Sequence, residues 1–91
     1  MRKFLATETF WAKFYALPTE QKEQSRVAWE IFKTNPFDPR LGAHKINALS
    51  GRAKRTVYAA VIAPNLRVAF YVEGESVVTI DIESHDIYAK W

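Results

Sequence analysis

The stretch from Arg55 to Tyr88 restricts the possible folds of this chain more than any other part of it. It holds three short runs rich in β-branched and aromatic residues, Thr56–Ile62, Leu66–Val72 and Val77–Ile82, separated by turn-forming residues. Runs of this length and composition are typical of β-strands. Because the connections are short, consecutive strands must pair in antiparallel order. The stretch therefore predicts a small twisted antiparallel sheet.

The turns and the alternation of side chains predict how these strands pair. A first hairpin with its tip at Pro64-Asn65 and a second with a three-residue loop at Glu73–Glu75 fix the register. Both hairpins then place one apolar set on a single face, which is expected to face the core. The opposite face is expected to be half polar, with Arg67 opposite Asp81, and not a second core. The predicted core face comprises Val57, Ala59, Val61, Leu66, Val68, Phe70, Val72, Val78, Ile80 and Ile82.

The residues before this stretch carry two helical patterns and one short strand pattern. A first apolar stripe follows Thr7, a typical N-cap, and ends at Pro18, which disfavours helix in the residue before it. A second stripe begins at Pro18 or Thr19 and stops at Asn35-Pro36, and a short strand is expected at Arg2–Ala6. We therefore expect residues 1–91 to form a single α+β domain, with an N-terminal helical hairpin packed on the sheet. The stripes comprise Phe10, Phe14, Leu17, Val27, Ala28, Ile31 and Phe32.

The composition excludes several classes of protein. The 91 residues include no cysteine, which rules out disulfide and thiolate metal sites and is typical of the reducing cytoplasm. The apolar part of Met1–Ala6 is too short for a secretory signal, and no apolar run approaches the roughly 20 residues that a membrane span needs. The histidines and carboxylates show no ligand spacing. We expect a cytoplasmic protein that has no membrane contact, metal or other cofactor.

Positive charge is concentrated in the middle of the chain. The net charge is only +3, but residues 39–72 contain no acidic side chain. Such a block indicates an anionic partner, and nucleic acid is the first candidate. The alternative is a chance clustering of solvated loop residues. The basic residues of the block are Arg40, Lys45, Arg52, Lys54, Arg55 and Arg67.

Several short segments, in order over nearly the whole chain, carry a resemblance to a known family. They are Leu17-Pro18, Trp29–Phe32, Asn35-Pro36, Pro39 with Leu41, His44-Lys45-Ile46, Asn65-Leu66-Arg67-Val68 and Ser84-His85-Asp86-Ile87-Tyr88. In order and spacing they resemble the RelE/ParE superfamily of bacterial toxins from toxin–antitoxin pairs. Members that resemble RelE are endoribonucleases, many of which cut mRNA on the ribosome. Members that resemble ParE inhibit DNA gyrase without cutting RNA.

Cleavage of RNA by its own 2′-hydroxyl needs a base, a cation beside the phosphate and an acid for the leaving oxygen. Arginine suits the phosphate because it donates two parallel hydrogen bonds. By the resemblance, Arg67 corresponds to the arginine that ribonuclease members carry on a central strand to hold the scissile phosphate. The alternative interpretation of Arg67 is a cross-strand salt bridge with Asp81.

The resemblance implies catalytic roles for four further residues. His85 matches a C-terminal histidine that some ribonuclease members use as acid or base, and Tyr88 would orient a base or donate a proton. Alternatively, His85 is a capping or turn residue and Tyr88 anchors a last short helix. Lys45 and Lys54 match basic residues near the substrate groove, although both are equally explained as solvated lysines. The general base is left open among His85, Lys45 and Lys54, because some members have arginine or lysine in place of that histidine.

Arg40, Arg52 and Arg55 are expected to contact the RNA backbone rather than to act in catalysis, and His44 is expected to be structural. We therefore predict a metal-free RelE-type endoribonuclease that cuts mRNA in the ribosomal A site. A cognate antitoxin would hold it inactive by laying a helix or strand across its apolar and basic surface. The alternatives are a ParE-like, non-catalytic gyrase inhibitor and a purely structural nucleic-acid-binding module.

Overall fold

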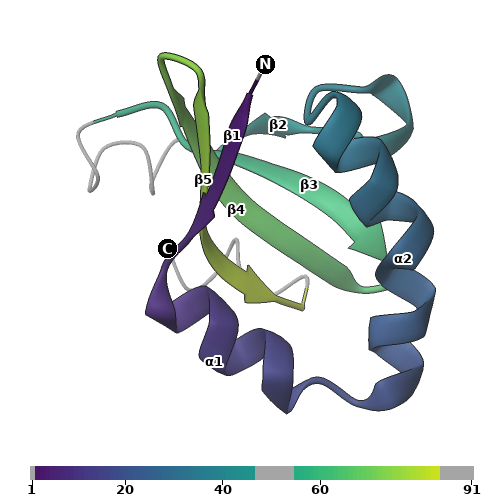
Figure 1. The fold of residues 1–91 in the computed structure, drawn as a ribbon. Coiled ribbons are helices and arrows are strands. Elements are labelled where there is room, and N and C mark those ends of the chain that lie inside the picture. Colours follow the sequence, from purple (N-terminus) through teal and green to yellow (C-terminus); the bar gives the residue numbers. More distant parts are fainter. Residues whose placement is uncertain (1, 47–54, 85–91) are drawn as a thin grey trace.

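A five-stranded sheet forms the centre of the computed structural model, which describes residues 2–46 and 55–84 (Figure 1). The strands lie in the order β1-β5-β4-β3-β2. Neighbours from β5 to β2 pair antiparallel, whereas β1 pairs parallel with β5. In chain order the elements are β1 (Lys3–Ala6), α1 (Glu8–Ala16), α2 (Thr19–Thr34), the short 3-10 helix η1 (Pro39–Leu41), β2 (His44–Lys45), β3 (Tyr58–Ala63), β4 (Leu66–Glu73) and β5 (Ser76–Glu83).

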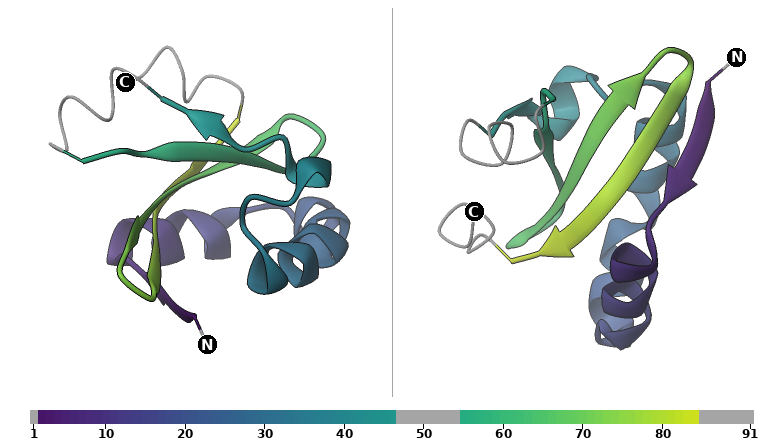
Figure 2. Two further views of the ribbon diagram at one scale, coloured as in Figure 1. Left: turned by 90° about the horizontal axis from the view of Figure 1, so that it is seen from above. Right: turned by 90° about the vertical axis from the view of Figure 1, so that its left-hand side faces the viewer.

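Both α-helices lie on the same face of the sheet (Figure 2). In the left-hand view of Figure 2, α1 and α2 are drawn below the strands. Side chains from both helices enter one hydrophobic core. This arrangement confirms the predicted α+β class and the helical hairpin on the sheet. The parallel strand β1 extends the antiparallel sheet that the sequence predicts. No helix among the described residues is long and apolar enough to cross a membrane.

The helices begin and end at the predicted signals. The Thr7 hydroxyl accepts a hydrogen bond from the backbone N–H of Phe10 at 3.2 Å and donates one to the carbonyl of Ile80 at 3.1 Å. This N-cap therefore also ties the start of α1 to β5. The residue before Pro18 has extended backbone, as the proline ring requires, and α2 stops directly before Asn35-Pro36.

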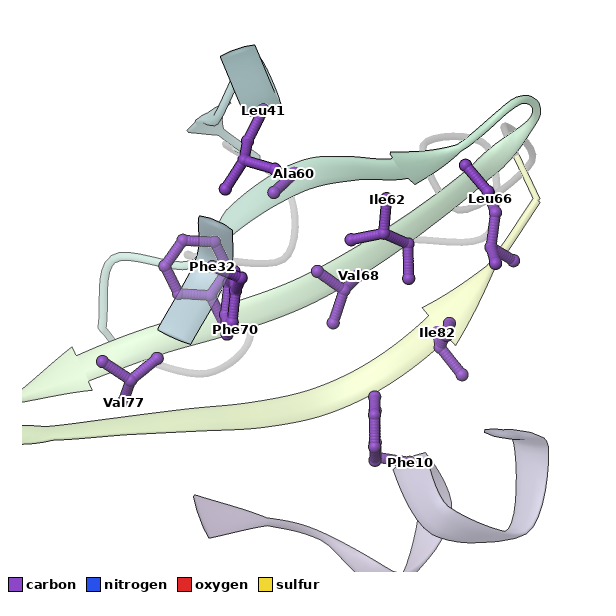
Figure 3. Packing of buried hydrophobic residues seen from close by; sticks show 11 residues of the cluster. Phe10, Phe32, Leu41, Ala60, Ile62, Leu66, Val68, Phe70, Val77 and Ile82 are labelled. Atoms are coloured by element: carbon purple, nitrogen blue, oxygen red, sulfur yellow. The ribbon is translucent and has the colours of Figure 1, made fainter. Parts of the chain in front are cut away.

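Buried aromatic side chains from both helices and from the sheet meet in the core between them (Figure 3). The ring of Phe32 from α2 meets the ring of Phe70 from β4 edge to face, with centroids 5.1 Å apart. Phe10 of α1 points toward Ile82 of β5. Because these side chains are almost fully buried, they supply much of the apolar burial that stabilises the domain. The buried members are Phe10, Phe32, Leu41, Ala60, Ile62, Ala63, Leu66, Val68, Phe70, Val77 and Ile82.

The register of strands β3 to β5 differs from the predicted one. Arg67 pairs with Glu83, and the predicted pairing of Arg67 with Asp81 is wrong. A two-residue Gly74-Glu75 turn, in which Gly74 has a φ of +60°, replaces the expected three-residue loop. The pairing also shifts once in each hairpin. A β-bulge of this kind adds an unpaired residue to one strand, and side-chain alternation alone does not reveal its position.

The shifted register also changes which side chains face the core. Ala60, Ile62 and Val77 belong to the core, where the predicted register placed Val61 and Val78. The opposite face carries a second buried cluster, so the expectation that it holds no second core is wrong. The physical reason is that β3 is apolar on both faces, and alternation cannot assign a face in such a strand. The second cluster consists of Ile46, Val57, Ala59 and Ala69.

Candidate functional site

The sheet face that points away from α1 and α2, here called the distal face, carries the arginine singled out from the sequence. Arg67 lies on the central strand β4, and its register partner on β5 is Glu83. Directly opposed residues share a face, and so do alternate residues of one strand. The distal face is therefore defined by Arg67, Ala69, Tyr71 and Glu83. Arg67 is half-buried, and its Nη1 donates a hydrogen bond to the carbonyl oxygen of Leu66 at 3.3 Å.

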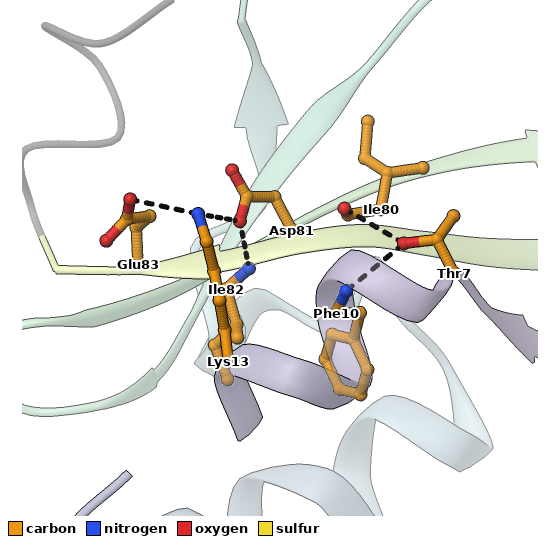
Figure 4. A network of polar contacts seen from close by, with 7 residues as sticks. All are labelled: Thr7, Phe10, Lys13, Ile80, Asp81, Ile82 and Glu83. Atoms are coloured by element: carbon orange, nitrogen blue, oxygen red, sulfur yellow. Dashed lines mark hydrogen bonds and ion pairs between the residues drawn. The ribbon is translucent and has the colours of Figure 1, made fainter. Parts of the chain in front are cut away.

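A lysine from α1 binds the carboxylates next to Arg67 (Figure 4). Lys13 reaches past β5, and its Nζ lies 2.7 Å from Oδ1 of Asp81 and 3.0 Å from Oε2 of Glu83. Asp81 is almost fully buried, and its Oδ1 also accepts a hydrogen bond from the backbone N–H of Ile82 at 2.9 Å. The alternative interpretation of Arg67 as the salt-bridge partner of Asp81 is therefore wrong.

Within residues 2–46 and 55–84, no carboxylate forms an ion pair with Arg67. Its guanidinium therefore keeps donors for an anionic ligand. No sequence pattern points to the role of Lys13, because a lysine in an amphipathic helix is ordinarily solvated.

Another arginine lies near Tyr71 on the distal face. The Arg55 guanidinium lies over the Tyr71 ring, 4.3 Å from its centroid, and its Nη1 is 2.7 Å from Oε2 of Glu73. Tyr71 is four positions from Arg67, which corresponds to about 13 Å along a strand. RNA bases stack on aromatic rings and on guanidinium planes. The alternation of side chains along the strand predicts that Tyr71 and Arg67 share a face, but Tyr71 is absent from the predicted site.

His44 and Lys45 are neighbours on β2, and their side chains therefore lie on opposite faces of the sheet. His44 pairs with Ala59, which lies on the distal face, and its Nδ1 donates a hydrogen bond to the carbonyl of Gly42 at 3.1 Å. Lys45 pairs with Tyr58, whose ring packs on the core side of the sheet. The structure therefore places His44 on the side of Arg67, and it does not bring Lys45 and Arg67 together.

Arg40 is held at η1 by the aspartate that caps this short helix. Its Nε and Nη2 donate to the two carboxylate oxygens of Asp38 at 3.0 and 2.9 Å. The backbone N–H of Arg40 donates to the same carboxylate at 2.9 Å. These hydrogen bonds lower the pKa of Asp38 from its ordinary 3.8 to about 2 and raise the pKa of Arg40. Arg40 and Arg55 are thus both paired with acids from outside the basic block.

Acid is expected to weaken the Asp38–Arg40 contact. Because folding lowers the pKa of Asp38, its stabilising contribution is present above pH 3.8 and is lost as the pH falls toward about 2. Asp38→Asn keeps a capping side chain but removes the charge. The variant should melt below the wild type near neutral pH, and the two melting temperatures should converge over this acidic window. A difference in melting temperature that stays constant down to pH 2 would contradict this assignment.

Arg52, Lys54, His85 and Tyr88 lie outside the described residues. In the sequence, His85 follows Glu83 by two positions, and Glu83 is the strand partner of Arg67. Within the described residues, no three histidine, aspartate or glutamate side chains gather as metal ligands would.

Solved structures share this architecture, whereas no family model and no curated protein matches the chain. A chain of the archaeal RelE–RelB complex from Pyrococcus horikoshii OT3 has a TM-score of 0.68 and 14% identity, over 91% of this chain and 93% of that one. A copper-bound mutant toxin from Helicobacter pylori has a TM-score of 0.62 and 20% identity, over 96% and 98%. A conserved hypothetical protein from the same organism has a TM-score of 0.62 and 19% identity, over 94% and 97%.

These likenesses extend over nearly the whole of each chain, and at such identities they concern the fold. The fold of this chain is therefore also found in a protein of the RelE–RelB complex and in a protein described as a toxin. This chain has the RelE-like fold that the sequence resemblance implied.

Proposed function

We propose that this protein is the toxin of a type II toxin–antitoxin pair and an endoribonuclease that cleaves mRNA on the ribosome, in the cytoplasm, without a metal. The observation that carries the proposal is Arg67. It lies on a central strand of a RelE-like fold, on the face away from the helices, and no described carboxylate is paired with it. A fixed guanidinium in this position suits a phosphate of the RNA backbone.

In the proposed reaction, a base removes the proton of the 2′-hydroxyl, and the resulting oxygen attacks phosphorus. The bond to the 5′-oxygen then breaks, and an acid protonates that oxygen. Arg67 stabilises the charge that develops on the non-bridging oxygens. His85 is the favoured acid or base, Tyr88 orients the reacting groups and Lys54 is the other candidate base. Lys45 is the weaker candidate because its register places it on the core side of β2.

The distal face also supports contacts with RNA beyond the scissile phosphate. The Tyr71 ring beneath the Arg55 guanidinium would accept a base by stacking. Arg52 and Arg40 would contact phosphates of the RNA backbone. Arg40 would give up one of its hydrogen bonds to Asp38 to bind a phosphate. These contacts add affinity that falls as salt rises. They carry little sequence information, and this suits an enzyme that acts where the ribosome presents the mRNA.

The direct test is to incubate the purified protein with translating ribosomes and to map the new mRNA 5′ ends. Cuts that appear only with ribosome-bound mRNA would support the proposal. Cuts in free mRNA would support the ribonuclease activity but contradict its dependence on the ribosome. DNA supercoiling by gyrase should be unaffected in a parallel assay. Intact mRNA together with inhibited gyrase would instead establish the ParE-like alternative. Intact mRNA and active gyrase would leave the structural nucleic-acid-binding module.

A cognate antitoxin is the proposed protein partner, in agreement with the RelE–RelB complex among the similar structures. The described chain has an apolar groove of about 800 Å³ between β1 and the two helices. β1 is an edge strand of the sheet and can accept a further strand. We propose that an amphipathic antitoxin segment covers this groove. The exposed apolar residues that line it are Phe4, Leu5, Trp11 and Val27.

A charge placed in the groove should weaken antitoxin binding. Val27 is 72% exposed, so Val27→Glu is compatible with the folded toxin but buries a carboxylate once the antitoxin is bound. We expect Kd to rise by roughly 10-fold or more, measured by titration calorimetry with the purified antitoxin. Gln24→Glu, on the same helix but outside the groove lining, is the matched control and should bind as the wild type does. Equal affinities of the two variants would place the antitoxin elsewhere.

A further inference from the structure

We propose that Lys13 is a positioning residue for Arg67. It binds two carboxylates that lie next to Arg67 on the distal face, those of Glu83 and of Asp81, which pairs with Ala69, and thereby keeps the Arg67 guanidinium available for a phosphate of the substrate. This inference rests on the proposed function, in which Arg67 holds the scissile phosphate.

The register creates a competitor for that phosphate. Glu83 lies directly opposite Arg67 on β5, and the Cβ atoms of directly opposed residues are about 4.5–5.5 Å apart. An arginine and a glutamate in this relation are well placed to form an ion pair across the strands. The Glu83 carboxylate instead lies 3.0 Å from Lys13 Nζ, and the Arg67 guanidinium contacts the carbonyl of Leu66. Lys13 therefore binds the carboxylate that would otherwise be the nearest partner of Arg67.

The fold fixes Lys13 in this position. β1 ends at Ala6, opposite Thr79, so no strand among the described residues pairs with the following part of β5 on that side. The start of α1 is tied to the same part of β5 through the Thr7 hydroxyl. From α1, Lys13 extends past the strand to the distal side, where both carboxylates lie (Figure 4).

Asp81 anchors the lysine at the distal face. Its carboxylate is 2% exposed, it lies 2.7 Å from Nζ, and it also accepts a hydrogen bond from the N–H of Ile82. A buried carboxylate strongly favours a fixed cation, because an unpaired buried charge is costly. The ammonium is therefore held at the strand edge by Asp81 and remains within reach of Glu83. An exposed lysine–glutamate pair alone would be too weak to hold this arrangement.

The separation of charges matters because guanidinium and phosphate must meet through paired hydrogen bonds. A carboxylate on Arg67 would occupy the same N–H donors, and the substrate would have to displace it. Loss of Lys13 should therefore weaken RNA binding through Arg67, although Lys13 itself does not touch the RNA. The effect should appear mainly in KM, because the competing carboxylate acts before the substrate is bound.

Lys13→Met and the double variant Lys13→Met/Glu83→Gln test this role. Lys13→Met should raise KM for mRNA cleavage about 10-fold with little change in kcat, and adding Glu83→Gln should restore most of the loss. Lys13→Arg should behave as the wild type. If the double variant is as impaired as Lys13→Met, although both melt at the same temperature, Lys13 does not act through Glu83. An unchanged KM in Lys13→Met would also overturn the inference.

A second measurement is independent of cleavage. The NMR signal of the Arg67 Nε–H reports the binding of a carboxylate to the guanidinium. The single variant Glu83→Gln should leave the chemical shift of this signal at its wild-type value. Lys13→Met should change the chemical shift, and the double variant should restore the wild-type value. If the wild type does not cut RNA but these shifts occur, the proposed function fails and the role of Lys13 stands. If the wild type cuts RNA but the signal does not move in Lys13→Met, only the role of Lys13 is overturned.

Discussion

Replacing Arg67 by alanine is expected to slow mRNA cleavage by about 100-fold or more and to leave the folded structure intact. The guanidinium is the group we assign to the charge that develops on the phosphate, and that charge is largest in the transition state. The side chain is only half-buried and forms no ion pair with a described residue, so its removal leaves no buried charge without a partner. Cleavage rates on programmed ribosomes and the melting temperature measure the two parts of this prediction.

Two further variants separate the role of Arg67 from a general effect of charge. Arg26→Ala removes the same charge from an exposed position on α2, where the arginine pairs only weakly with Glu23 at 3.3 Å. It should cleave mRNA at nearly the wild-type rate. Arg67→Lys keeps the charge but loses the two parallel hydrogen bonds, and intermediate activity is expected. If growth arrest and mRNA cleavage survive Arg67→Ala, the catalytic assignment is wrong.

Phe70→Ala is expected to reduce the free energy of unfolding by about 3–5 kcal/mol. Phe70 is fully buried on β4, and its ring contacts the rings of Phe32, Phe37 and Tyr58. Its removal would therefore leave a cavity between the sheet and α2. Since the free energy of unfolding of a native protein is only about 5–15 kcal/mol, this loss is a large fraction of the total stability. Urea denaturation followed by circular dichroism measures the loss.

A variant on the same strand provides the comparison for Phe70→Ala. Val72 is 38% exposed, and Val72→Thr keeps a β-branched side chain of similar shape. It should change the unfolding free energy by less than about 1 kcal/mol. If Phe70→Ala were as stable as Val72→Thr, the Phe32–Phe70 contact would not be the centre of the core. Phe70→Leu, which leaves a smaller cavity, should fall between the two variants.

The elements of this fold could be predicted from the sequence because their signals are local. Thr7, Pro18 and Asn35-Pro36 set the helix boundaries through the conformation of one or two residues. The tip of the first hairpin at Pro64-Asn65 could be predicted in the same way, and Asn65 adopts a positive φ of 56°. The position of Arg67 on a central strand, facing away from the helices, could also be predicted. Val68 and Phe70, which alternate with Arg67 along β4, are strongly apolar and therefore face the core.

The strand register and the network around Lys13 could not be predicted in this way. Register depends on two bulges and on a strand that is apolar on both faces, so no single residue type reveals it. The contact between Lys13 and Asp81 joins residues 68 positions apart and needs the packing of α1 on β5. Nothing in the sequence distinguishes Lys13 from a solvated lysine. The roles of His85 and Tyr88 stay predictions, because both lie outside the described residues.

The parallel pairing of β1 with β5 has a consequence for the order of folding. Residues 3–6 pair with residues 76–79, and the Thr7 hydroxyl reaches a carbonyl 73 positions away. Contacts of such long range form late, because the chain must first close a large loop. During synthesis, β1 cannot pair with β5, and Lys13 cannot bind Asp81 and Glu83, until β5 has left the ribosome. The surface around Arg67 therefore cannot form before β5 is synthesised, and the newly made protein should become active only after β5 is in place.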